Sequence, residues 1–145
     1  MLNGDFPYTL NMSVKQTSVV IVESQPLMRA ALGVALSMEG MTVLAELSDS
    51  RDTLQAASTL TPDLILFSVN HSSPIDLDRI SVLRQELPQV LLVALVTGEF
   101  RGQERAALDH GAHVVLTKST PRSELLYAIE RALDKKIYPA SAQVD

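Results

Sequence analysis

The sequence predicts an α/β fold, a doubly wound five-stranded parallel sheet with helices on both of its faces. Five short β-branched or leucine-rich runs alternate with five stretches of apolar residues at helical spacing, an alternation that is typical of parallel sheets. Several strand runs are apolar without interruption, as expected of strands buried on both faces. The 145 residues, 46% hydrophobic and 20% charged, fit one globular domain large enough to bury a core.

The first half of the chain predicts strands over 19–22, 41–46 and 64–67. A helix over 26–38 follows the first strand, with Pro26 in its first turn and Gly40 as its left-handed stop. The apolar residues expected to turn toward the core are spaced at helical intervals, at Leu27, Ala30, Ala31, Val34, Ala35 and Met38. A second helix is predicted from a cap at Ser50 to about Leu60, ended by Thr61 and Pro62.

The second half continues the alternation. A polar loop over 70–74 leads into a helix whose inward residues are Leu77, Ile80, Leu83 and Leu87, and Pro88 ends it. A fourth strand over 90–95, a loop over 98–102 and a weak helix closed by Gly111 come next. A short fifth strand covers 114–116. The last helix is capped by Thr120, and its apolar face consists of Leu125, Ile129, Ala132 and Leu133.

Three segments are predicted: an irregular arm over 1–16, a domain over 17–136 and the start of a linker or tail over 137–145. The arm shows no periodicity and contains Gly4 and Pro7, although Phe6, Tyr8 and Leu10 could pack against the body. Neither a signal peptide nor an apolar run long enough to cross a bilayer is present. We therefore expect a cytoplasmic protein without membrane contact.

Composition excludes several classes of function. Twelve basic and seventeen acidic residues give a net charge of −5, so we expect no direct nucleic-acid binding by this segment. The chain has no cysteine, which removes thiolate metal sites and cysteine nucleophiles. His110 and His113 flank the end of a predicted helix and do not share a face, so no metal site is expected. The phosphate-binding glycine motifs and catalytic triad spacings are also missing, so an enzyme or nucleotide binder is disfavoured.

In doubly wound folds the functional site lies beyond the carboxyl ends of the strands, where the strand order reverses. For the flavodoxin-like order 2-1-3-4-5 this point falls between the first and third strands. The residues that the predicted strands deliver there are Glu23, Ser24, Ser68, Val96, Thr97 and Lys118.

The chain resembles the bacterial response-regulator receiver (CheY-like) family. The matching stretches are 19–23, 62–66, 111–112 and Lys118, and residues 132–139 are similar to the end of the last helix in the NarL/FixJ (LuxR-type) subfamily. The resemblance implies an acidic pair that binds Mg²⁺ after the first strand and a phospho-accepting aspartate after the third. It also implies a threonine or serine after the fourth strand, a lysine after the fifth, and an aromatic switch residue on the fifth.

At most of these positions the sequence departs from the family. Glu23 keeps the first acidic position and Lys118 the lysine, but Ser24 and Ser68 replace the second acid and the aspartate. Val96 falls at the threonine position, unless the loop shifts by one residue and brings Thr97 there. Val115 occupies the aromatic position.

These departures predict a pseudo-receiver with a vestigial phosphorylation pocket. Mg²⁺ is usually held by carboxylates, and one carboxylate would remain where the family has three. A serine hydroxyl is a weak nucleophile without a positioned base, so Ser68 is interpreted as a neutral filler. No catalytic residue, metal or cofactor is expected. Glu23 and Lys118 are expected to form a buried ion pair, since the fold brings these strand ends together.

In such a protein, signals would be transmitted through contacts between the surface of this domain and a partner. Tyr127 and Arg131 on the last helix form a candidate interface, because aromatic residues and arginine are enriched in interface cores. The leading hypothesis is a phosphorylation-independent receiver of a transcriptional response regulator, acting as a homodimer or on an attached or partner DNA-binding domain. The alternative is a stand-alone adaptor that binds a histidine kinase or another regulator protein.

Overall fold

The computed structural model describes residues 16–70, 74–99 and 101–137. Their strands form one parallel sheet of order β2-β1-β3-β4-β5, as predicted. The strands are β1 (Ser18–Val22), β2 (Thr42–Leu47), β3 (Leu64–Ser68), β4 (Leu91–Val96) and β5 (Val114–Thr117). The strands β2 and β4 lie one residue later than predicted, β3 and β5 extend one residue further, and β1 begins one residue earlier. Ser68 and Val96 are therefore the last residues of their strands.

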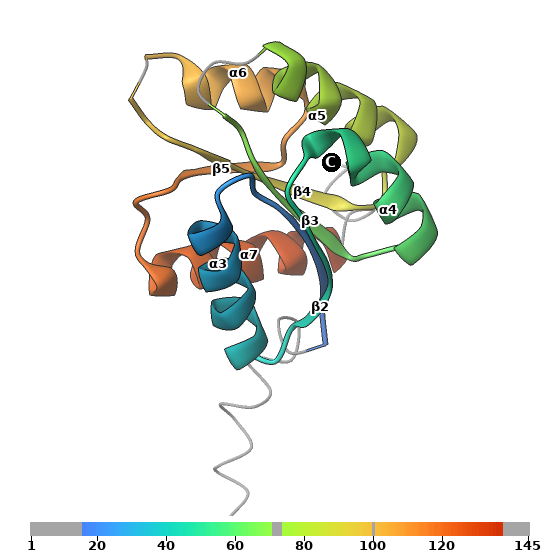
Figure 1. The fold of residues 1–145 in the computed structure, drawn as a ribbon, viewed down its shortest axis with the longest axis vertical. Helices are drawn as coiled ribbons and strands as arrows, with labels where there is room; N and C mark the ends of the chain where they lie inside the picture. Colours follow the sequence, from blue (N-terminus) through green and yellow to red (C-terminus); the bar gives the residue numbers. More distant parts are fainter. Residues whose placement is uncertain (1–15, 71–73, 100, 138–145) are drawn as a thin grey trace, which may run out of the picture.

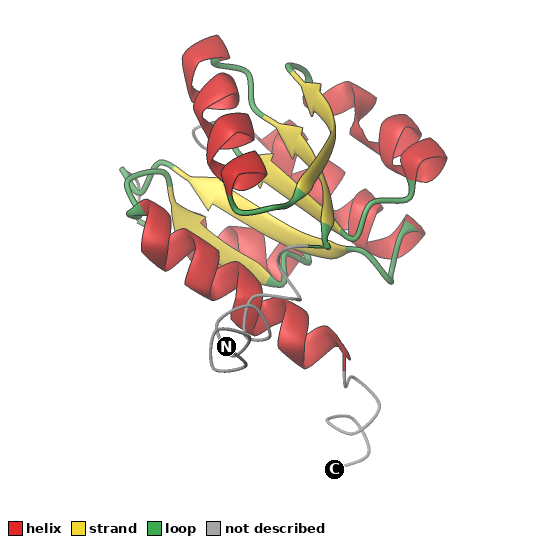
Figure 2. Ribbon diagram, turned by 90° about the horizontal axis from the view of Figure 1, so that it is seen from below, coloured by secondary structure: helices red, strands yellow, loops and turns green. Residues whose placement is uncertain are grey.

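Helices cover both faces of this sheet, as Figures 1 and 2 show. The helices α3 (Pro26–Met38) and α7 (Arg122–Ile137) lie on one face, and α4 (Thr53–Leu60), α5 (Pro74–Glu86) and α6 (Gln103–His110) lie on the other. Two hydrophobic clusters result. Val19 and Ile21 of β1 join the first cluster, and Val20 and Val22 join the second. This alternation explains why β1 is an uninterrupted apolar run: both of its faces are buried.

The predicted inward face of α3 is wrong. Leu27, Val34 and Met38 are exposed, together with Ala30 and Ala31. The buried residues of α3 are instead Leu32, Gly33 and Leu36. The helix is apolar on two sides, so periodicity alone could not identify the side that faces the sheet.

The start of α4 also differs from the prediction. A short 3-10 helix (Ser50–Asp52) precedes it, and the cap is Asp49, whose carboxylate accepts a hydrogen bond from the Arg51 backbone N–H. This N–H, with help from the Arg51 guanidinium, lowers the pKa of Asp49. Ser50 therefore does not cap this turn.

The predicted helix ends are confirmed. Gly40 and Gly111 have φ of 90° and 122°, a region in which residues other than glycine are strained. Thr61 ends α4 in the left-handed region before Pro62. Most of the inward residues predicted for α5 and α7 are buried: Ile80, Leu83, Leu125, Ile129 and Leu133. The others are partly buried and pack against the two clusters: Leu77, Leu87 and Ala132.

Two of the predicted segments fall largely outside the described residues: the arm, of which only Gln16 is described, and the tail, of which only Ile137 is described. Their boundaries stay predictions. Among the described residues, none of the helices is both long and apolar enough to cross a membrane.

Candidate functional site

The carboxyl ends of four parallel strands place the predicted site residues at one edge of the sheet. Glu23 and Ser24 follow β1, Ser68 ends β3, Val96 ends β4 and Lys118 follows β5. The pairing of Val96 with Thr117, and the hydrogen bond from the Lys118 N–H to the Val96 carbonyl (2.8 Å), fix these two strand ends side by side. The structure therefore gathers the ends of β1, β3, β4 and β5 as the sequence predicted.

Glu23 and Lys118 form the predicted ion pair. The Lys118 Nζ lies 3.3 Å from Glu23 Oε1, and the two side chains are 16% and 0% exposed. The other carboxylate oxygen, Oε2, accepts a hydrogen bond from the Gln25 backbone N–H (2.9 Å). Within the described part of the chain Oε1 accepts no hydrogen bond, so the link to Lys118 is mainly electrostatic. The only carboxylate delivered by the ends of β1 and β3 is thus already neutralised by a cation of the same chain.

The two serines at the pocket differ in their surroundings. Ser68 is buried, and among the described residues its hydroxyl has no hydrogen-bond partner. Ser24 is exposed, and its hydroxyl donates to the Asn70 side-chain oxygen (3.2 Å). Neither serine hydroxyl is seen to contact a group that would act as a base. A serine hydroxyl needs a positioned base to act as a nucleophile, and the interpretation of Ser68 as a neutral filler stays a prediction.

Val96, and not Thr97, faces the interior at the end of β4. Val96 is fully buried in the second cluster. Thr97 lies one residue further, and its hydroxyl donates to Gln103 Oε1 (3.1 Å) at the start of α6. The same oxygen accepts the Gly98 N–H (2.8 Å). The loop is therefore tied to α6, which leaves Thr97 engaged away from the strand end.

A polar network beside the pocket was not predicted from the sequence. Asp76, buried in the first turn of α5, accepts hydrogen bonds from the Ser50 hydroxyl (2.7 Å) and the Asn70 N–H (3.0 Å). Arg79 donates to the same Ser50 hydroxyl. On the opposite side, Arg29 donates to the Glu23 carbonyl (2.8 Å). A hydrophobic pattern carries no signal for such pairs, because it does not distinguish a buried polar side chain from a solvated one.

We expect Asp76→Ala to destabilise the fold by about 2 kcal/mol, since it removes a charged acceptor from two donors. Asp76→Asn, which keeps one acceptor oxygen, should cost less. Urea unfolding followed by circular dichroism measures both values. A loss below about 0.5 kcal/mol for Asp76→Ala would show that this network does not hold the loop after β3.

Side chains that commonly bind metals are sparse at this edge. Among the described residues, no group of three or more His, Cys, Asp or Glu side chains is arranged to hold a metal ion. Magnesium needs several oxygen ligands and is usually bound through carboxylates.

Comparison with known proteins gives a consistent result. The family model described as the response regulator receiver domain matches residues 19–130. The nitrate/nitrite response regulator protein NarL of Escherichia coli K12 is 26% identical over 116 residues, 79% of this chain and 54% of that protein. The DNA-binding transcriptional activator EvgA of the same organism is 25% identical over 123 residues, 83% of this chain and 59% of that protein. The chain thus spans little more than half the length of these relatives.

Solved structures share the fold. A DNA-binding response regulator of the LuxR family from Staphylococcus aureus aligns with a TM-score of 0.74 and 18% identity, covering 81% of this chain and 99% of that one. The activated N-terminal receiver domain of RstA from Klebsiella pneumoniae aligns with a TM-score of 0.72 and 22% identity, covering 80% and 97%. At such identities the likeness establishes the architecture.

Proposed function

Because this chain belongs to the response regulator receiver domain family, we propose that it is a receiver of the NarL/LuxR type that works without aspartyl phosphate. The observation that carries this proposal is the state of the pocket. Ser68 ends β3, where the family resemblance places the phospho-accepting aspartate, and Lys118 Nζ is paired with Glu23 Oε1 at 3.3 Å. These features support a receiver scaffold in which Glu23 and Lys118 are kept, while the other groups that would receive and hold a phosphoryl group are replaced.

Electrostatics supports the proposal. A pocket with three carboxylates and one lysine carries an excess of negative charge, which a divalent cation relieves. Here one carboxylate faces one lysine, and the charge is already balanced. Because each hydrogen bond or contact with a charged group contributes about 1.5–3 kcal/mol, the loss of two carboxylates is expected to weaken Mg²⁺ binding by orders of magnitude.

The test is calorimetric titration with Mg²⁺, with and without beryllofluoride. We expect no saturable heat at micromolar to low millimolar concentration. A matched variant, Ser24→Asp/Ser68→Asp, restores both carboxylates and should bind Mg²⁺ more tightly than the natural chain. Micromolar Mg²⁺ binding or stoichiometric beryllofluoride binding by the natural chain would contradict the proposal.

In this proposal, helix α7 forms the contact surface through which the receiver acts on its partner. Tyr127 is 59% exposed there, the Arg131 guanidinium lies 5.7 Å from its ring centroid, and Arg131 Nη1 donates to its hydroxyl at 3.0 Å. This pre-ordered aromatic–arginine pair is a suitable anchor for a contact with a second copy or with a DNA-binding domain, since such residues dominate interface energetics.

Sedimentation of the Tyr127→Ala/Arg131→Ala variant tests this surface. If α7 mediates pairing, the dimer fraction should fall by about tenfold or more in association constant, equal to about 1.4 kcal/mol. Leu108→Ala, an exposed change on α6, serves as the control and should leave the distribution unchanged. An identical monomer–dimer balance in all three proteins would remove α7 from the proposed interface.

The controlled partner is proposed to be a DNA-binding domain, attached or separate. The relative EvgA is described as a DNA-binding transcriptional activator, and this chain matches little more than half of it. Reading the gene beyond Asp145 tests the attached form: a helix-turn-helix domain is expected there. A stop codon at that point would favour the adaptor alternative, with a histidine kinase or another regulator as partner.

A further inference from the structure

A groove lies between α3 and the edge strand β2, and it shares no residue with the candidate functional site. The groove has a volume of about 370 Å³ and is lined by Gly33, Val34, Ser37, Met38 and Glu46. Within the described residues β2 pairs with β1 alone, so no further strand covers this side of the groove. The groove is therefore open to a partner.

The Glu46 carboxylate is held against the backbone of α3 inside this groove. Gly33 has no side chain, and a Cβ atom at position 33 would overlap the carboxylate. Glycine therefore makes room for a charged group that comes from β2. The overlapping atoms lie at the end of a flexible side chain, so a residue larger than glycine would displace the carboxylate rather than break the fold. Glu46 is an exposed residue, which leaves its charge within reach of a partner.

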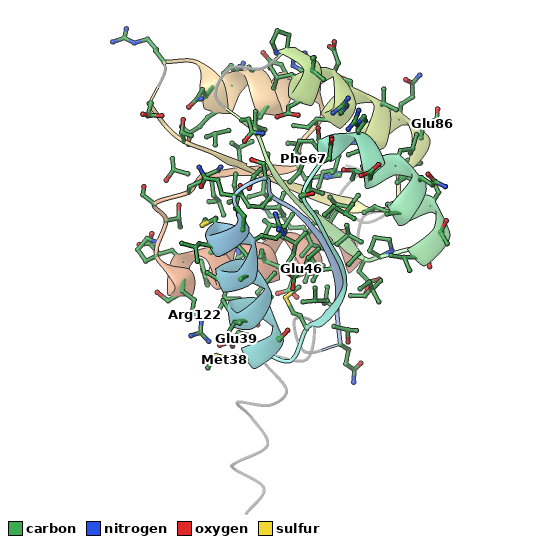
Figure 3. The ribbon with its side chains drawn as sticks, in the orientation of Figure 1. Met38, Glu39, Glu46, Phe67, Glu86 and Arg122 are labelled. Atoms are coloured by element: carbon green, nitrogen blue, oxygen red, sulfur yellow. The ribbon has the colours of Figure 1, made fainter. Side chains whose placement is uncertain are left out.

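The charge of Glu46 is not compensated within the described part of the chain, where it forms no ion pair. Glu39, the residue after Met38, gives the contrast. Its carboxylate lies 2.8 Å from the Arg122 guanidinium, and Figure 3 shows both residues at one end of α3. Of these two glutamates, Glu46 is thus the one whose charge can bind an external cation.

The walls beside the Glu46 carboxylate are apolar. Val34 and Met38 are 59% and 67% exposed, and they continue an exposed apolar line on α3 that includes Leu27, Ala30 and Ala31. Lysine and arginine lay their methylene stems along apolar surface while the charged head stays at a polar group. The groove combines these two surfaces, so its chemistry matches a long basic side chain.

We propose that the groove binds a lysine or arginine side chain of the DNA-binding domain, with the charged head on Glu46 and the stem over Val34 and Met38. The identity of this partner rests on the proposed function. DNA-binding domains carry clustered basic residues because they contact phosphates. The net charge of this chain is −5, and opposite charges on two partners favour their association.

Charge also favours a basic partner over a second copy of this chain. A twofold contact uses the same surface of both copies. Such a contact through the groove would bring two Glu46 carboxylates into one interface, and the groove lining supplies no lysine or arginine to neutralise them. A basic domain supplies the missing cation directly.

Peptide titration of the full chain tests the chemistry of the groove. The probe is the acetylated and amidated peptide Gly-Gly-Lys-Gly-Gly, and binding is followed by NMR of the backbone amides. Millimolar peptide should cause saturable shifts that centre on the groove residues. The same peptide with norleucine in place of lysine keeps the stem without the charge and should cause no such shifts. An equal response to both peptides would overturn the proposal.

Two variants locate the binding site. Glu46→Gln removes the charge, and Gly33→Ala keeps the charge but displaces the carboxylate from its place over the helix. Each should weaken lysine-peptide binding about two- to fivefold, the range of an exposed ion pair. Glu86→Gln, at an exposed glutamate of α5, is the matched control and should leave the affinity unchanged. Unchanged affinity in both groove variants, or an equal loss in the control, would contradict the proposed site.

Hydrogen exchange of the backbone amides identifies the occupant. With the DNA-binding domain present, attached or added in trans, amides 33–38 should exchange more slowly than in the chain that ends at Asp145. Glu46→Lys should abolish this difference. Concentration-dependent protection of the chain alone would assign the groove to a second copy. Peptide binding without protection by the domain would also rule out the proposed occupant.

Failure of this inference can be distinguished from failure of the proposed function. A phosphoryl adduct on the natural chain would contradict the proposed function and leave the peptide titration of the groove unchanged. Loss of the Glu46-dependent peptide binding would contradict this inference alone, because Glu46 is not one of the residues at the phosphorylation pocket.

Discussion

Lys118→Met is expected to lower the free energy of unfolding by about 3 kcal/mol, the lower end of the range for breaking a buried ion pair. The reason is the environment of Glu23, which is 1% exposed and has Lys118 Nζ as its only cationic partner among the described residues. Removing that cation leaves a carboxylate without compensation in the interior. The lower end applies because Lys118 is itself 16% exposed. Urea unfolding at neutral pH measures the loss.

The control is the double variant Glu23→Gln/Lys118→Met. The glutamine keeps an oxygen for the Gln25 N–H but carries no charge, so stability should return to within about 1 kcal/mol of the natural chain. This recovery separates lost charge compensation from lost packing of the lysine stem. If the double variant is as unstable as Lys118→Met, the ion pair is not what holds this edge together.

Phe67→Ala should cost about 3–5 kcal/mol, the usual range for removing a buried aromatic ring. Phe67 is fully buried in β3, between β1 and β4, and belongs to the second cluster. Its position at the middle of the molecule is visible in Figure 3. The sheet and the flanking helices cannot close the resulting cavity, because β3 is held on both sides by neighbouring strands.

Denaturant unfolding of Phe67→Ala should therefore show a much lower midpoint with little change in slope. Val82→Ala, on the exposed side of α5, is the comparison and should stay within about 0.5 kcal/mol of the natural chain. A loss below about 1 kcal/mol for Phe67→Ala would mean that the second cluster is loosely packed, against the burial seen here.

The strands were predictable because the residues that indicate a buried strand are contiguous in the sequence. The runs 19–22 and 64–67 are apolar on both faces, which only a central parallel strand requires. Helix ends were equally clear at Gly40 and Gly111, where a left-handed backbone favours glycine. The alternation of strands and helices, with right-handed crossovers, predicted a doubly wound sheet. The order 2-1-3-4-5 was that of the flavodoxin-like form of such sheets.

The inward face of α3 was not predictable in the same way. The helix has apolar residues on two sides, and the longer line, from Leu27 to Met38, resembled the core side. The sheet instead takes the side with Leu32, Gly33 and Leu36, where glycine allows close approach. Choosing between two apolar faces requires knowing the tertiary contacts, which the hydrophobic period does not contain.

Only part of the candidate site could be predicted, because some of its residues are brought together by tertiary contacts that the local sequence does not encode. Glu23 and Lys118 were found because strand ends converge in every parallel sheet of this order. Asp76 and Gln103 were missed: both are polar residues near the start of a helix, and nothing in their local pattern distinguishes a buried network member from a solvated side chain. Their partners lie in the 3-10 helix before α4 and in two loops, whose paths only the structure gives: Ser50, Asn70, Thr97 and Gly98.

The central claim is that this receiver does not accept a phosphoryl group. The most direct measurement is intact-mass spectrometry after incubation with acetyl phosphate and Mg²⁺, with a receiver that keeps its phospho-accepting aspartate treated in parallel. We expect the natural chain to keep its unmodified mass while the parallel receiver gains one phosphoryl group. A stoichiometric phosphoryl adduct on the natural chain, at Ser68 or elsewhere in the pocket, would contradict the claim.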